Sequence, residues 1–172
     1  MSTQRTIPNE TFPKTDFSII ASMFLANAQS FEKAIEGIPP EQWLRRPGED
    51  SNHLTWVAGH IVTMRAIVPR FLGLEWSAPW ENLFARGARL AAPDEYPDPG
   101  EIKRAWHEVS GKLSGALANI STEVLERPVP KEAFSLDGKV GGSIALLSLH
   151  ETYHVGQAGY LRKWLGYGQA VG

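Results

Sequence analysis

Apolar residues recur at steps of three and four in four segments of the chain, which is the spacing of one buried face of an α-helix. The four segments span about residues 15–36, 52–72, 98–120 and 143–165. Regions rich in Pro and Gly separate them, and no convincing pair of strands lies between them. The pattern therefore predicts an all-α fold, a four-helix bundle, formed as a single domain over residues 1–172.

The ends of the helices carry recognisable signals. Ser51 is a good N-cap for the second helix, and Gly73 is a good stop for it. Pro69 lies inside this helix and is expected to kink its last turn or to end it early. Asp98, followed by Pro99, marks the start of the third helix.

Two of the three connections are long enough to cross over the bundle. Residues 74–97 include four aromatic side chains, and a loop of this length is often a lid or a binding loop. The alternative is that its aromatic residues anchor it to the core, with a short helix near residues 81–89. Residues 121–142 contain two Pro, an Asp-Gly and a Gly-Gly pair, and are read as a second connecting loop with a short extended piece.

Composition excludes several classes of function. The 172 residues carry a net charge of −2 without a basic block, which argues against a nucleic-acid partner. The chain has no cysteine, so disulfides, zinc–thiolate sites and a cysteine nucleophile are excluded, and any thiol chemistry needs a thiol supplied by a substrate. The polar segment 1–15 lacks the apolar core of a signal peptide, and no run of 18 apolar residues is present. We expect a soluble, cytoplasmic protein that does not enter a membrane.

The strongest chemical signal is a pair of histidines, His150 and His154, one turn apart on the fourth helix. Residues at this spacing share a helix face, with β-carbons about 5–6 Å apart. Two imidazoles placed in this way can bind one metal ion at about 2.0–2.1 Å. Leucines precede and follow the pair, so the site is expected to face the interior or a cleft.

A bundle builds a metal site from facing helices, so a third ligand is expected from another helix. His60 lies in the middle of the second helix, within its apolar stripe, and is the preferred third ligand. His53, in the first turn of the same helix, is predicted to lie at the mouth of the pocket. His107 is one step away from the apolar stripe of the third helix and is predicted to lie on the surface.

Gln157 follows His150 by seven residues and points in nearly the same direction. Its amide could bond a ligand histidine, a coordinated water or a substrate. Glu151 points about a quarter turn away, so it is not expected to join the ion. Three histidines with an open position are typical of a catalytic site, and zinc or nickel fits them best, although cobalt and copper are not separated from them. The alternative is that these are core histidines bonded to neighbouring carbonyls, to Tyr153 or to Glu151.

Two stretches resemble the DinB-like (damage-inducible) family. These are Thr55-Trp56-Val57-Ala58-Gly59-His60-Ile61, a W-x-x-G-H helix, and the run from His150 to Gln157 that continues into Leu161–Gly166. Tyr96-Pro97, ahead of the third helix, is also similar. The resemblance implies a four-helix bundle with crossover connectivity, often dimeric, that holds a divalent metal on His60, His150 and His154. It also implies, for some branches, thiol-dependent transfer with a low-molecular-weight thiol cosubstrate and, for others, hydrolysis.

These observations predict a divalent-metal-dependent enzyme, a thiol-dependent S-transferase or a hydrolase acting on a small molecule. An open metal can lower the pKa of a coordinated water to about 7 or bind a thiol as thiolate. Gln157, His53 and Trp56 are the predicted substrate-binding residues, and no further general base is identifiable. The alternative is a non-catalytic metal- or ligand-binding homodimeric bundle.

Overall fold

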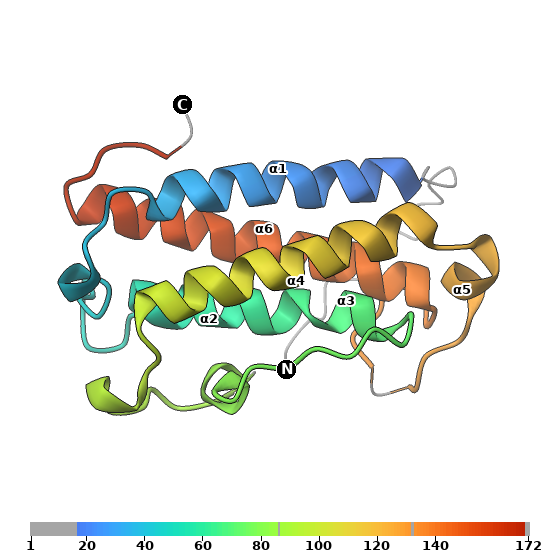
Figure 1. The fold of residues 1–172 in the computed structure, drawn as a ribbon, viewed down its shortest axis with the longest axis horizontal. Helices are drawn as coiled ribbons and strands as arrows, with labels where there is room; N and C mark the ends of the chain where they lie inside the picture. Colours follow the sequence, from blue (N-terminus) through green and yellow to red (C-terminus); the bar gives the residue numbers. More distant parts are fainter. Residues whose placement is uncertain (1–16, 86, 132, 171–172) are drawn as a thin grey trace, which may run out of the picture.

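The computed structural model describes residues 17–85, 87–131 and 133–170, whose regular structure is helical (Figure 1). Four long helices occupy the predicted places, so the prediction of an all-α fold is confirmed. The polar segment 1–15 and the predicted start of the first helix near residue 15 lie outside the described residues. The long helices are α1 (Phe17–Ile35), α2 (Leu54–Arg65), α4 (Pro99–Asn119) and α6 (Val140–Trp164). The short elements are the helices α3 (Ile67–Arg70) and α5 (Thr122–Glu126) and the 3₁₀ turns η1 (Pro40–Gln42), η2 (Glu81–Phe84) and η3 (Pro93–Glu95).

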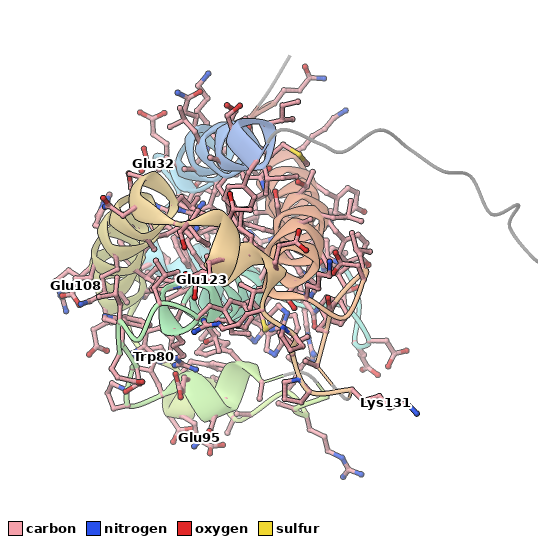
Figure 2. The ribbon with its side chains drawn as sticks, turned by 90° about the vertical axis from the view of Figure 1, so that its right-hand side faces the viewer. Glu32, Trp80, Glu95, Glu108, Glu123 and Lys131 are labelled. Atoms are coloured by element: carbon pink, nitrogen blue, oxygen red, sulfur yellow. The ribbon has the colours of Figure 1, made fainter. Side chains whose placement is uncertain are left out.

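The directions of the helices require one crossover. Figure 1 shows that α2 and α4 run in one direction, while α1 and α6 run in the other. Residues 71–98 must therefore return along the bundle between α3 and α4, and Figure 2 shows this segment, with Trp80 and Glu95, on one side of the helices. The second long connection, between α4 and α6, joins neighbouring helix ends. Helix α6 packs on α1 and α2, and α2 also packs on α4.

Helix α2 lies at the centre of the core because its residues from Leu54 to Val62 are all buried. The apolar stripes of α1 and α4 supply Phe31 and Trp106, whose rings pack with centroids 4.5 Å apart. The connections also contribute to the core. Trp43 and Phe84 are fully buried, and the Trp43 indole donates to the carbonyl oxygen of Ile38 at 3.1 Å.

The N-cap predicted for α2 was wrong by two residues. His53, rather than Ser51, caps the helix, since its Nδ1 accepts a hydrogen bond from the backbone N–H of Trp56 at 3.1 Å. An imidazole nitrogen can replace the side-chain oxygen of a usual N-cap because it offers the same acceptor to an unpaired N–H.

The predicted break at Pro69 is confirmed. Helix α2 ends at Arg65, and α3 continues as a separate short helix that contains Pro69. Proline has no N–H to donate to the carbonyl four residues earlier, so the helix cannot continue unbroken through this turn. The start of α4 also agrees with the sequence, because Asp98 Oδ1 accepts from the N–H of Gly100 at 2.7 Å.

The second connection contains a helix that the sequence did not predict, since the five residues of α5 are too few to show a helical period. Its short extended piece is present as an isolated antiparallel bridge between Pro128 and Lys139. Helix α6 then begins at Val140, three residues earlier than expected.

None of the helices in the described ranges has both the length and the apolar character needed to cross a membrane.

Candidate metal centre

Three histidines from two helices meet in the interior. The Nε2 atom of His150 lies 3.4 Å from Nε2 of His60 and 3.2 Å from Nε2 of His154. Metal–nitrogen bonds of about 2.0–2.1 Å at tetrahedral angles place two ligand nitrogens about 3.3 Å apart. The two measured separations match that value, and one ligand atom from each of the three residues lies within 4.8 Å of the others.

In two of these rings the other nitrogen, Nδ1, already forms a hydrogen bond. Nδ1 of His60 donates to the carbonyl oxygen of Phe84 at 2.6 Å, and Nδ1 of His154 donates to Oε1 of Gln157 at 2.9 Å. A carbonyl oxygen only accepts hydrogen bonds, so each Nδ1 carries the proton and each Nε2 presents a lone pair. Bonds of this kind fix the tautomer and orientation of histidines that bind metals.

Burial keeps the rings of His60 and His154 neutral. It lowers the pKa of His154 to about 4, an effect to which the neighbouring His60 and His150 contribute and which the bond to Gln157 opposes. Burial also lowers the pKa of His60, opposed by its bond to Phe84. Neutral imidazoles at pH 7 offer the lone pairs that a metal ion requires.

The donor set therefore fits a divalent ion. The lone pairs of His60 Nε2 and His154 Nε2 both point toward the ring of His150. One cation can bind a nitrogen of each of the three rings, whereas a single N–H could hydrogen-bond to only some of these nitrogens. Within the described residues, no carboxylate joins this cluster. Glu151 does not face it, as expected, because it pairs with Arg65.

A cavity of about 310 Å³ lies beside the three rings. Trp56 forms one wall and stacks on His60 with ring centroids 4.7 Å apart and planes 10° apart. Phe134, from the connection before α6, meets His150 edge-on with centroids 6.0 Å apart. The lining residues are Trp56, His60, Met64, Gly87, Phe134, His150 and His154.

The other predicted site residues lie in different places. Gln157 forms a hydrogen bond with His154, so of the three partners considered for its amide the structure shows the ligand histidine. Trp56 lines the cavity, as expected for a residue that contacts substrate. His53 was expected at the mouth of the pocket, but it is buried as the N-cap of α2 against the edge of Tyr96 and is not among the described residues that line the cavity. Burial, together with the charge of Arg46, lowers its pKa to about 4. His107 is exposed on α4, as predicted.

Sequence reasoning missed a buried ion pair next to the histidines. Arg65 on α2 donates from Nε and Nη2 to the two carboxylate oxygens of Glu151 on α6, at 2.8 and 2.7 Å. The guanidinium also lies over the ring of Trp106, 4.0 Å from its centroid. The available signal was a charged residue four positions after Ile61, within the apolar stripe of α2. The pair joins the two helices that carry the histidines.

Phe84 could not have been found from the sequence, because its contribution is a backbone carbonyl from a distant turn. It lies 24 residues beyond His60, at the end of η2. The connection 71–98 therefore does more than cover the core, since it supplies the acceptor that orients the histidine of α2.

Comparison with known proteins gives the family. A search of curated proteins found no match. The sequence model of the DinB superfamily matches residues 23–158, which is most of the chain and includes His60, His150 and His154. The match agrees with the helical fold and with the cluster of three histidines, and the chain belongs to the DinB superfamily.

Proposed function

We propose that the protein is a metal-dependent enzyme in which His60, His150 and His154 hold one divalent ion, zinc or nickel. The observation that carries this proposal is the convergence of the three Nε2 atoms, two of them with lone pairs fixed by a bonded Nδ1. Three imidazoles leave a further coordination position for a substrate or water, as in catalytic sites.

The cavity favours an enzyme over the alternative, a non-catalytic metal- or ligand-binding dimeric bundle. A structural site is closed by four protein ligands, whereas here a space of about 310 Å³ adjoins the histidines. The bound ion would supply Lewis acidity that activates a thiol or a water as a nucleophile near neutral pH. Trp56, Met64 and Phe134 would exclude bulk water and contact the substrate, while Gln157 would hold His154 in position.

Two reaction classes fit this site: transfer to a low-molecular-weight thiol cosubstrate, and hydrolysis of a small molecule. The chain contains no cysteine, so a transferred group would have to be accepted by an external thiol. A homodimer is part of the proposal. In this scheme His53 stabilises the start of α2 rather than contacting substrate.

The metal centre is tested with His154→Ala. Removing one of three ligands should abolish stoichiometric binding of zinc and nickel, measured by titration calorimetry and by elemental analysis of purified protein. His107→Ala is the matched control because His107 is exposed on α4, and it should bind metal as the wild type does. Wild-type protein that binds neither ion, or a His154→Ala variant that binds both normally, would refute the metal centre.

The reaction is tested by offering the metal-loaded protein small electrophiles with and without thiols. Turnover that requires a thiol identifies the transferase, and turnover without one identifies the hydrolase. Activity that survives both metal removal and His154→Ala would show that catalysis does not depend on this centre.

A further inference from the structure

A groove of about 420 Å³ lies between α1 and α4, and it shares no lining residue with the cavity beside the histidines. Six of its eleven lining residues are alanine or serine, and such small side chains leave the space between the two helices unfilled. Two of the lining residues, Leu25 and Ser114, are exposed, so the groove opens to the surface. The lining residues are Ala21, Ser22, Phe24, Leu25, Ala28, Arg65, Ser110, Leu113, Ser114, Leu117 and Ala118.

One charged group, the guanidinium of Arg65, reaches this groove from α2. The side chain is only 2% exposed, so the guanidinium forms part of the floor rather than of the rim. It bonds the carbonyl oxygen of Phe24 on one wall and the hydroxyl of Ser110 on the other. Glu151 compensates its charge through two further bonds, so the floor as a whole is neutral.

One N–H of this guanidinium has no acceptor among residues 17–85, 87–131 and 133–170. A guanidinium carries one N–H on Nε and two on each Nη. The Nε hydrogen and one on Nη2 bind Glu151, and the second on Nη2 binds Phe24. Nη1 uses one hydrogen for Ser110 and keeps the other free. A buried donor without an acceptor is rare in native structures, and here it lies where a groove leaves room for a ligand.

We propose that the groove between α1 and α4 binds a small uncharged molecule that has an apolar body and a carbonyl or hydroxyl oxygen. The oxygen accepts the free hydrogen of Arg65 Nη1. The body packs on Leu25, Leu113 and Leu117, which are the leucines of the two walls. This site is separate from the metal centre and does not depend on it.

The ion pair explains why the ligand is uncharged. Glu151 already balances the guanidinium, so a carboxylate in the groove would lose its hydration without gaining an unpaired cation. A ligand ammonium would have no hydrogen to accept from Arg65, since it only donates. A neutral oxygen supplies the missing acceptor and adds no charge.

The dimensions of the groove set the size of the ligand. The lining residues of α4 extend from Ser110 to Ala118, which corresponds to about 12 Å along the helix axis. Ser110 stands at one end of this row, so the polar group binds near that end and the body extends toward Ala118. An apolar cavity of about 150 Å³ holds one benzene molecule, so this groove accommodates a body of about 10–15 non-hydrogen atoms. A medium-chain ketone, alcohol or ester has this size and chemistry.

The ligand class is tested by titrating metal-free protein with methyl hexyl ketone, octanoate and octylammonium while the amide resonances are followed by NMR. These probes have the same length and differ in the charge and acceptor of the head group. The ketone should bind with a dissociation constant of about 0.1–1 mM, as its size permits. Its shifts should concentrate at residues 21–28 and 110–118. Both charged probes should bind about tenfold more weakly or less.

The location is tested with Ser114→Phe, which fills the groove from an exposed position and should weaken ketone binding about tenfold or more. Lys112→Phe is the matched control, because Lys112 is also exposed on α4 but does not line the groove, and its affinity should equal that of the wild type. Absence of ketone binding, which would leave water as the occupant, would overturn the proposal. So would octanoate or octylammonium binding as tightly as the ketone, shifts confined to the cavity beside the histidines, or unchanged affinity in Ser114→Phe.

Discussion

Replacing Glu151 with leucine should destabilise the protein more than any surface change. The side chains of Glu151 and Arg65 are 4% and 2% exposed, and two bonds of 2.8 and 2.7 Å join them. Leucine has a similar volume but leaves the guanidinium without its anion. Removing one partner of a buried pair costs about 3–5 kcal/mol, chiefly because the remaining charge is buried without compensation.

The surroundings of Arg65 place the cost near the lower end of that range. Its Nη1 still donates to Ser110 Oγ at 2.9 Å, its Nη2 still donates to the carbonyl oxygen of Phe24 at 3.2 Å, and the ring of Trp106 still covers the guanidinium. We therefore expect a loss of about 3 kcal/mol in the free energy of unfolding. With a urea m-value of about 1.5–3 kcal/mol/M, the midpoint falls by about 1–2 M.

The assay is urea unfolding followed by far-ultraviolet circular dichroism. The double variant Arg65→Met/Glu151→Leu should recover most of the loss, because two apolar side chains replace the pair without leaving a charge. Glu126→Gln, which removes the exposed ion pair with Lys139, is the control and should leave the midpoint unchanged. A decrease below about 1 kcal/mol for Glu151→Leu would refute the argument that an uncompensated buried charge dominates.

Three further outcomes are expected. Gln157→Leu removes the acceptor of His154 Nδ1 and should weaken zinc binding by about 10–100-fold in calorimetry; unchanged affinity would contradict its orienting role. Because burial holds the pKa of His154 at about 4 in the folded chain, against about 6.5 when unfolded, metal-free protein should be most stable above pH 6.5 and lose stability as the pH falls toward 4. A urea midpoint that is equal at pH 7 and pH 4.5 would contradict this. Gly59→Ala would drive a β-carbon into the Phe84 ring and should cost about 1–3 kcal/mol, whereas Gly111→Ala, where the β-carbon meets nothing, should not destabilise α4.

Much of the histidine cluster could be predicted because half of its geometry is local. The spacing of His150 and His154 fixes them on one helix face whatever the fold, and His60 stood out as a histidine within an apolar stripe. The position of His53 was missed because an imidazole acting as an N-cap looks, in sequence, like any polar residue of a first turn. The Phe84 carbonyl carries no side-chain signal at all.

The sequence by itself determined the four long helices, their buried faces and the candidate ligands, since these depend on steps of three and four residues. It also allowed the break at Pro69 to be predicted, because a missing N–H acts within its own helix. Only the tertiary structure decided which helices run together, that the connection 71–98 brings a carbonyl to His60, and that Arg65 reaches Glu151. Those contacts join residues 24 to 86 positions apart, and no local periodicity specifies such a distance; packing of the whole core does.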